Sequence, residues 1–269
     1  CRHPMSLTDE LLALARTVGR EASAYVAGAR PTGRVDVAST KSSPTDVVTA
    51  IDEACERLIR SLVLGSRPDD SFQGEEGDDI AGTSGVEWIV DPIDGTVNFV
   101  YGIPAYAISI AAAVDGRVEV GCVINIASGE EFTAVRDQGS FLHTAAGTAR
   151  LVAPEVERLD QALVSTGFSY VPSTRAVQAR AVAKMLPQVR DVRRVGSAAL
   201  DLCGLAAGRA DAYVEQGLKP WDLAAGGLIA SEAGIVVSGL DGIPGERLVM
   251  AAHPSVSGEF FALVRACGF

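Results

Sequence analysis

The sequence lacks any apolar run of about 18 residues that charge does not interrupt, so it predicts no transmembrane helix. Residues 1–10 contain charge and proline but no apolar core, and no signal peptide is therefore expected. Cysteine is sparse, and its positions show no paired spacing: Cys1, Cys55, Cys122, Cys203 and Cys267. We therefore expect reduced thiols in a cytoplasmic protein that has no membrane partner.

Positive charge is also scarce, because 23 lysines and arginines stand against 34 aspartates and glutamates, for a net charge of −11. This balance argues against nucleic acid as a primary partner, since a phosphate backbone needs a basic face. An acidic enzyme that acts on an anionic phosphate must recruit cations locally. The charge balance therefore points to a metal ion.

The histidines and serines give no sign of a nucleophilic hydrolase. None of His3, His143 and His253 lies in a recognisable motif. Neither Ser165 nor Ser197 has the surroundings of a nucleophile elbow, so a Ser-His-Asp hydrolase is not expected. The sequence also contains no dinucleotide-binding fingerprint, internal repeat or low-complexity tract.

Two aspartates follow a short apolar run in the first half of the chain. Residues 88–90 are predicted to form a buried strand, which Pro92 should end because it has no backbone N–H to donate. Asp91 and Asp94 then stand three residues apart. An aspartyl-phosphate enzyme would need its two aspartates two residues apart, so this spacing favours a bridged metal over covalent chemistry.

A glycine and a threonine come directly after these aspartates. Gly95 allows the backbone to approach a ligand, and the amides of Gly95 and Thr96 suit a phosphate group at the start of a new element. A plain strand and solvated turn would need neither Asp91 nor Thr96. Carboxylates beside a phosphate site favour Mg²⁺, which prefers oxygen ligands and often shares them with substrate phosphate.

Three motifs, in the same order, resemble those of the inositol monophosphatase family. They are Gly-Glu-Glu at residues 74–76, Asp-Pro-Ile-Asp-Gly-Thr at 91–96, and Trp-Asp-Leu-Ala-Ala-Gly at 221–226, which continues to Glu-Ala-Gly at 232–234. Residues 97–106 are most similar to the actinobacterial, SuhB-type branch of the family. The resemblance covers nearly the whole chain. It implies a lithium-sensitive, Mg²⁺-dependent phosphoric monoester hydrolase that cleaves inositol 1-phosphate by metal-activated water.

The resemblance implies a set of metal ligands for two or three Mg²⁺ ions. Asp91 would bridge two ions. Glu75 and the carbonyl of Ile93 would hold the first ion, whereas Asp94 and Asp222 would hold the second. Two metal ions of this kind can activate water and stabilise a leaving oxygen.

The resemblance also implies catalytic residues: Glu75 and Thr96 would orient the attacking water, and Asp52 would bond to Thr96. Lys41 would balance carboxylate charge or help position a third ion. From their surroundings in the sequence alone, the usual interpretation of Glu75 and Asp52 is a solvated charge, and Asp222 could be an ordinary helix N-cap.

Substrate contacts are implied at Gly95, Thr96, Gly196, Ser197, Ala198, Glu215 and Asp222. The carboxylate of Glu215 suits a polyol, because it accepts hydrogen bonds from hydroxyl groups. The expected partner is thus a small phosphorylated polyol, and the resemblance implies a homodimer.

Two alternatives remain open at this point. Related phosphatases with the same metal carboxylates act on fructose 1,6-bisphosphate, histidinol phosphate or 3′-phosphoadenosine 5′-phosphate. Some SuhB-type relatives are regulatory partners in transcription, although an intact metal set and a negative charge argue against that as the sole role.

The order of elements predicts an α+β half over residues 1–145 and an α/β half over residues 146–269. The resemblance implies that they form a layered α/β/α/β/α sandwich, with the site between the halves. Helices are expected at residues 6–27, 47–64, 175–186, 197–207, 221–233 and 255–266. Strands are expected at residues 35–38, 71–73, 88–90, 105–114, 117–126, 131–136, 140–143, 162–166, 191–195, 211–215, 235–238 and 248–252.

Turns and caps complete these expectations. Ser6 and Asp9 predict a capping box for the first helix. Thr45 or Asp46 should cap the second helix, and a role of Asp46 in the site is left open. Residues 145–150 are expected to form a loop.

Overall fold

A computed structural model of the chain describes residues 5–41 and 47–269, so Thr45 and Asp46, which were expected to cap a helix, lie outside the described residues. The helices are α1 (Leu7–Ala29), α2 (Ala50–Ser66), α3 (Thr96–Tyr101), α4 (Pro172–Met185), α5 (Ala198–Ala206), α6 (Pro220–Glu232) and α7 (Pro254–Cys267). All six predicted helices are present, and each begins within one turn of its predicted start.

Within residues 5–41 and 47–269, the strands form three sheets. The smallest pairs β1 (Ser39–Thr40) with β2 (Val47–Val48). A seven-stranded sheet contains β3 (Ser71–Gly74), β4 (Val86–Asp94), β5 (Ala107–Val114), β6 (Arg117–Asn125), β7 (Glu131–Val135), β8 (Gly139–Thr144) and β9 (Gly147–Leu151), in that order. A five-stranded sheet has the order β11 (Asp191–Arg193), β10 (Leu163–Thr166), β12 (Ala212–Glu215), β14 (Val249–Ala252) and β13 (Val236–Ser238).

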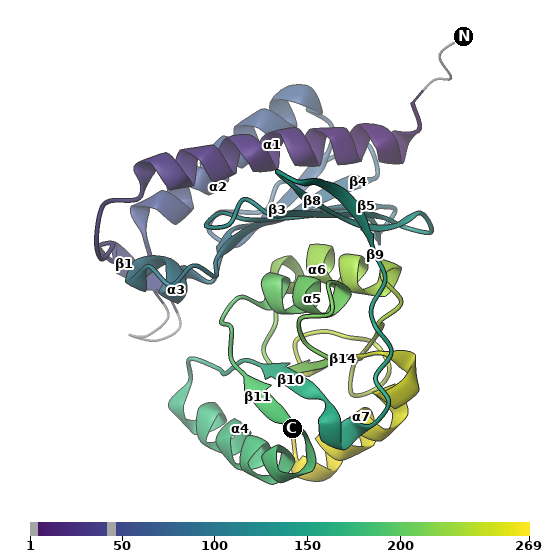
Figure 1. The fold of residues 1–269 in the computed structure, drawn as a ribbon. Helices are drawn as coiled ribbons and strands as arrows, with labels where there is room; N and C mark the ends of the chain where they lie inside the picture. Colours follow the sequence, from purple (N-terminus) through teal and green to yellow (C-terminus); the bar gives the residue numbers. More distant parts are fainter. Residues whose placement is uncertain (1–4, 42–46) are drawn as a thin grey trace.

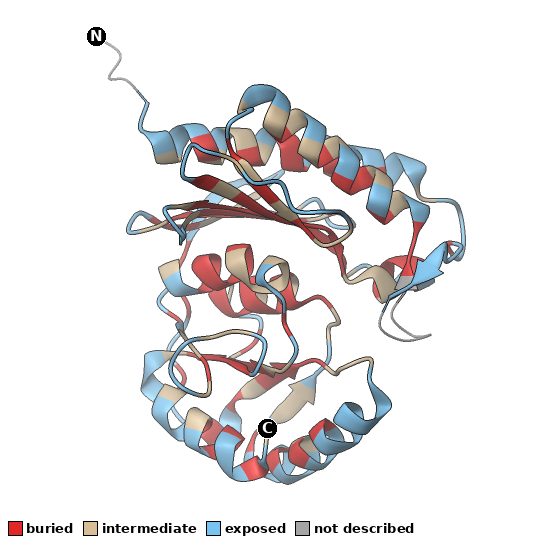
Figure 2. Cartoon of the chain, turned by 180° about the vertical axis from the view of Figure 1, so that it is seen from behind, coloured by how far each residue is buried: buried red, intermediate tan, exposed pale blue. Residues whose placement is uncertain are grey.

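The two large sheets and three pairs of helices form five layers (Figure 1). Helices α1 and α2 cover one face of the seven-stranded sheet, α5 and α6 lie between the two large sheets, and α4 and α7 cover the far side. The predicted α/β/α/β/α sandwich is confirmed. Figure 2 shows that buried residues line the inner faces, whereas the outer helices expose one side to solvent.

The middle helical layer contacts both large sheets. One apolar cluster joins Phe132 of β7, Leu202 of α5, Ile229 of α6 and Val249 of β14. Burial of such side chains stabilises a fold by about 1.5–3 kcal/mol each. Helices α5 and α6 therefore hold the two sheets at a fixed distance, and this fixes the site at their junction.

Helix α1 shows how the sequence sets a boundary. The Ser6 hydroxyl accepts a hydrogen bond from the backbone N–H of Asp9 at 3.1 Å, and the Asp9 carboxylate accepts one from the N–H of Ser6 at 3.3 Å. The predicted capping box is thus confirmed.

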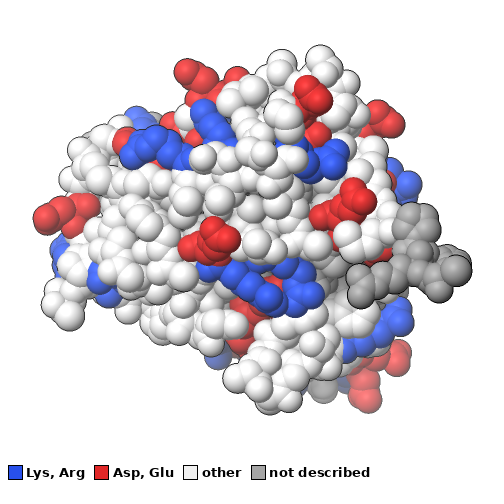
Figure 3. Space-filling model, turned by 90° about the horizontal axis from the view of Figure 1, so that it is seen from above, with Lys and Arg blue, Asp and Glu red and all other residues white. Residues whose placement is uncertain are grey.

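In Figure 3, which shows the molecule from above, acidic and basic side chains are interspersed on this face.

The region before α2 differs from the prediction in two ways. The strand expected at residues 35–38 is wrong, because the first pairing begins at Ser39. Helix α2 begins at Ala50, because the β-branched pair Val47–Val48 remains extended in β2. Thr49 caps the helix instead, and its hydroxyl accepts hydrogen bonds from the N–H groups of Ile51 and Asp52.

Two further expectations for the seven-stranded sheet are corrected. Strand β4 does not end at Asp91 but continues to Asp94, and Pro92 lies in a register shift where the ladder needs no N–H from it. Residues 147–151 form the edge strand β9 rather than a loop. Four of its five residues are exposed, so it lacks the alternation that would have indicated a strand.

Candidate active site

A cavity of about 500 Å³ lies where the two large sheets and the middle helices meet. It is lined by residues from both halves of the chain. From the first half come Lys41, Glu75, Asp91, Ile93, Asp94, Gly95 and Thr96, and from the second half come Gly196, Ser197, Ala198, Glu215 and Asp222, among others. Of the predicted site residues, all except Asp52 line this cavity.

Three carboxylates form a cluster in the cavity. One oxygen from each of Asp91, Asp94 and Asp222 lies within 4.8 Å of the others. Burial, together with neighbouring negative charge, raises the pKa of Asp91 and of Asp222, and burial raises the pKa of Asp94 to about 6. Two buried carboxylates and one half-buried one at this distance need protons or a cation, and hard oxygen ligands suit Mg²⁺.

Hydrogen bonds fix two of these carboxylates in place. An oxygen of Asp91 accepts the N–H of Ile93 at 3.0 Å within the bulge of β4. Asp222 lies in the first turn of α6, and one of its oxygens accepts the N–H of Lys219 at 2.7 Å. The N-cap of α6 is Lys219, so the interpretation of Asp222 as an ordinary N-cap is wrong; Asp222 is the third residue of the helix and lies in the acidic cluster.

Asp94 connects the two halves of the chain. Its Oδ2 accepts the hydroxyl of Ser197 at 2.5 Å and the backbone N–H of Ala199 at 2.7 Å, both at the start of α5. Ser197 thus holds a carboxylate of the cluster as well as capping α5, where its hydroxyl accepts the N–H of Leu200.

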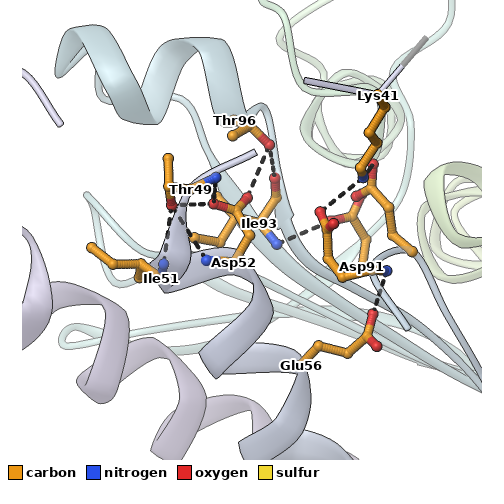
Figure 4. Close-up of polar contacts among 10 residues, drawn as sticks. Lys41, Thr49, Ile51, Asp52, Glu56, Asp91, Ile93 and Thr96 are labelled. Atoms are coloured by element: carbon orange, nitrogen blue, oxygen red, sulfur yellow. Dashed lines mark hydrogen bonds and ion pairs between the residues drawn. The ribbon is translucent and has the colours of Figure 1, made fainter. Parts of the chain in front are cut away.

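Glu75 lies at the cavity wall, directly after β3. Lys41 Nζ contacts Glu75 at 2.7 Å and Glu76 at 2.8 Å, and Figure 4 shows Lys41 reaching into the acidic group. Burial alone would lower the pKa of Lys41, but the two glutamates outweigh it and raise that pKa. The side chain of Glu75 is 22% exposed, so it is not the freely solvated charge that the sequence left open.

Thr96 and Asp52 interact as predicted. The Thr96 hydroxyl lies 3.1 Å from both Asp52 Oδ1 and the carbonyl oxygen of Ile93, and it can donate to either (Figure 4). Asp52 is fully buried, and its second oxygen accepts the N–H of Thr49 at 3.0 Å. Burial raises the pKa of Asp52 to about 6. The alternative of a solvated Asp52 is therefore wrong.

Glycine and asparagine bring the two halves into close contact. Gly95 has φ = 93°, and a Cβ there would lie 2.9 Å from the carbonyl oxygen of Ala105 and 3.1 Å from that of Gly196. Asn98 donates from its amide to the carbonyls of Ala105 and Val195, each at 2.8 Å. These contacts place residues 196–198 beside the acidic cluster, where Ser197 contacts Asp94.

The sequence analysis missed several residues of the cavity. Arg194 adds an exposed cation, and an ion pair of 2.5 Å joins Lys219 to Glu246 at the rim. Tyr213 supports Glu215 from beneath, through a 2.6 Å hydrogen bond. Arg194 stands two residues before Gly196 in the sequence, a position that could have indicated it, whereas a long-range pair such as Lys219 and Glu246 leaves no local signal.

The layered fold, with an acidic cluster between its halves that is compatible with metal binding, agrees with the phosphatase class that the motifs resemble. The model of the inositol monophosphatase family matches residues 7–266, and the chain belongs to this family. The expectation of a phosphoric monoester hydrolase is thereby confirmed at the level of the family.

Individual relatives cover nearly the whole chain. Inositol-1-monophosphatase of Mycobacterium leprae is 44% identical over 96% of this chain and 94% of its own. The Nus factor SuhB of Escherichia coli is 37% identical over 98% and 96%. The solved structure of Mycobacterium tuberculosis SuhB superposes with a TM-score of 0.83 at 42% identity, over 96% of this chain and 97% of that one.

The structure bears on two further expectations, which concern membrane-spanning helices and the state of the cysteines. Among the helices of residues 5–41 and 47–269, none combines the length and apolar character that crossing a membrane requires. Four cysteines, Cys55, Cys122, Cys203 and Cys267, are buried free thiols.

Proposed function

We propose that the protein hydrolyses inositol 1-phosphate to myo-inositol and phosphate, in a reaction that requires Mg²⁺. The observation that carries this proposal is the cluster of Asp91, Asp94 and Asp222 in one cavity with Glu215. The cluster suits a cation beside a phosphate group, and Glu215 suits a hydroxylated leaving group. The 44% identity to a mycobacterial inositol-1-monophosphatase supports the choice of substrate.

Five groups would hold two or three Mg²⁺ ions: the carboxylates of Glu75, Asp91, Asp94 and Asp222, and the carbonyl oxygen of Ile93. Mg²⁺ bound there would neutralise phosphate charge and lower the pKa of water. The fit rests on the donor set, which contains only oxygen, and on the need of buried carboxylates for compensating positive charge.

Thr96 and Glu75 would orient the attacking water, and Asp52 would hold Thr96. The Thr96 hydroxyl is within donating distance of two acceptors, Asp52 and the Ile93 carbonyl, and neither is a free base that could activate it as a nucleophile. The amides of Gly95 and Thr96 would contact the phosphate. A direct attack by water predicts inversion at phosphorus, with no phosphorylated enzyme.

The second half of the chain would recognise the polyol. Gly196, Ser197 and Ala198 line the cavity beside the acidic cluster, and Tyr213 holds Glu215, which also lines the cavity. Burial raises the pKa of Glu215 to about 7, so near neutral pH it is present in both protonation states. Either state can hydrogen-bond to a hydroxyl group.

A substrate panel tests the proposal. Phosphate release from inositol 1-phosphate, fructose 1,6-bisphosphate, histidinol phosphate and 3′-phosphoadenosine 5′-phosphate should give the highest kcat/KM for inositol 1-phosphate. The activity should disappear on chelation, return with Mg²⁺ and be inhibited by Li⁺. A preference for another member of the panel would replace inositol 1-phosphate as the substrate.

A regulatory role in transcription is the second candidate, because the Nus factor SuhB of Escherichia coli is 37% identical. A pull-down with RNA polymerase, beside the phosphatase assay, separates the two. Binding without hydrolysis would favour the regulatory role. We also infer a cytoplasmic homodimer, and light scattering should return twice the chain mass of 27.9 kDa.

A further inference from the structure

A tyrosine lies directly beneath the polyol side of the cavity. Strands β10 and β12 run parallel, and their register places Ser165 beside Tyr213. Since side chains alternate along a strand, Tyr213 and Glu215 point to the same face. Tyr213 is fully buried, and its hydroxyl donates to Glu215 Oε2 at 2.6 Å.

Gly167 forms the other wall around the Glu215 carboxylate. A Cβ at Gly167 would lie 2.0 Å from Glu215 Oε1 and 2.1 Å from Oε2. The backbone of Gly167 does not have a positive φ, so its conformation does not require glycine. The space occupied by the carboxylate therefore accounts for the absence of a side chain at this position. Gly167 and Glu215 both line the cavity.

Asp201 of α5 completes the polar surroundings of the tyrosine. It is 2% exposed, it hydrogen-bonds to Ser165, and its Oδ1 has no partner. Negative charge on Asp201 or Glu215 disfavours ionisation of Tyr213, and burial does so more strongly. The tyrosine hydroxyl therefore keeps its proton and remains a donor to Glu215.

We propose that Tyr213 is a positioning residue. The Tyr213 hydroxyl and the Gly167 gap, which is the space that the missing side chain leaves for the carboxylate, together fix Glu215 for recognition of a hydroxyl group on the leaving alcohol. This inference rests on the proposed function, in which Glu215 contacts a polyol. Tyr213 fixes Oε2, so Oε1 is the oxygen left for the substrate. The pair then discriminates between phosphate esters by their alcohol and leaves the phosphate chemistry unchanged.

The first test compares Tyr213→Phe with wild type on inositol 1-phosphate and on phenyl phosphate, which has no hydroxyl on its alcohol. Loss of a hydrogen bond to a charged group should raise KM for inositol 1-phosphate about tenfold, with kcat changed less than about threefold. Kinetics on phenyl phosphate should stay within about twofold of wild type. Tyr25→Phe, on the solvent side of α1, is the control and should leave the kinetics on both substrates unchanged.

A second variant tests the gap without removing a polar group. Gly167→Ala should displace the carboxylate and produce the same selective rise in KM, whereas Gly65→Ala, where a Cβ would meet nothing within 4 Å, should not. Equal losses on both substrates, or no change on either in both variants, would overturn the inference. If wild type itself fails to hydrolyse inositol 1-phosphate, the proposed function falls first, and the inference falls with it.

Discussion

Each aspartate of the cluster has an oxygen that accepts a backbone N–H, and these bonds decide what a substitution does. In Asp94, Oδ2 accepts two hydrogen bonds from the start of α5. An asparagine can keep these bonds only through its carbonyl oxygen, which turns its NH₂ group toward the cation site. A neutral donor would then face a position that needs a negative acceptor.

Asp94→Asn should therefore remove activity and leave the fold intact. Loss of outer-shell partners of a metal costs about 10–100-fold, so loss of a direct ligand should reach at least the upper end. Phosphate release measured over a range of Mg²⁺ concentrations, with circular dichroism for the fold, checks this. Asp79→Asn, at an exposed position, is the control. Turnover close to wild type at saturating Mg²⁺ would contradict the assignment of Asp94.

Asp201 lies outside the metal cluster and makes a different prediction. Burial raises its pKa well above the usual value, so its neutral form is favoured in the folded protein. Because the folded pKa exceeds the unfolded value of about 3.9, wild-type stability must fall as pH rises between the two values. The slope cannot exceed about 1.4 kcal/mol per pH unit from this group.

Asp201→Asn carries no titrating group, so its stability relative to wild type should increase from pH 4.5 to pH 8. Urea unfolding at several pH values measures the difference in the free energy of unfolding. Asp78→Asn, at an exposed site, should leave the pH dependence as in wild type. If the free energies of unfolding of Asp201→Asn and wild type change in parallel with pH, Asp201 is charged in the folded protein or its charge is compensated by a partner.

Much of the site at the residue scale could be predicted because its ligands lie in short motifs. Asp91, Asp94 and Thr96 are close in sequence, so one turn brings them together. Asp222 was predictable only by resemblance, since its own surroundings indicate an ordinary cap. Tyr213 and Arg194 were missed because their role depends on neighbours that only the fold brings near.

At the scale of elements, α5 joins the helix-capping function to the acidic cluster. The Ser197 hydroxyl accepts the N–H of Leu200 as an N-cap and donates to Asp94. Ser197 is itself buried, so water does not replace either bond easily. A single substitution in this turn should therefore affect both stability and the cation site.

Ser197→Ala should lower the free energy of unfolding by about 1–2 kcal/mol, through loss of the cap, and also raise the Mg²⁺ concentration needed for half-maximal activity. Ser6→Ala provides a matched control, because Ser6 caps α1 far from the cluster. It should cost a similar free energy without changing the Mg²⁺ requirement. Equal Mg²⁺ dependence in both variants would separate Ser197 from the site.

Elements with clear periodicity were predictable, and those without it were not. Helix α1 has a capping box and an apolar stripe, and both appear in the sequence. The edge strand β9 is largely exposed and has no apolar alternation, so its pairing with β8 depends on the hairpin rather than on burial. The predicted division into residues 1–145 and 146–269 stays a prediction.

At the scale of the whole molecule, the acidic cluster joins parts that come from both halves. Asp91 and Asp94 belong to the seven-stranded sheet, whereas Asp222 lies in the first turn of α6 in the middle layer. The chain carries a net charge of −11, so this buried cluster adds repulsion to an already negative molecule. A cation in the cluster would therefore stabilise the junction between the halves.

Mg²⁺ should raise Tm, and the rise should be larger at pH 8 than at pH 5. The pKa of Asp94 is raised to about 6, and those of Asp91 and Asp222 are raised too. Because the folded pKa values exceed the unfolded ones, protons stabilise the cluster at low pH, and this stability is lost as pH rises through the folded values. Mg²⁺ would replace the protons that leave.

At a Mg²⁺ concentration 100 times Kd, the gain is about 2.7 kcal/mol, which corresponds to a Tm increase of about 5–10 °C for a chain of this size. Thermal melts after chelation, with Mg²⁺ added back at pH 5 and pH 8, measure it. KCl at matched ionic strength separates ion binding from screening, and Asp94→Asn should show a smaller rise. Because any surface effect of Mg²⁺ would persist in that variant, an equal rise in Asp94→Asn and wild type would place the stabilising ion elsewhere.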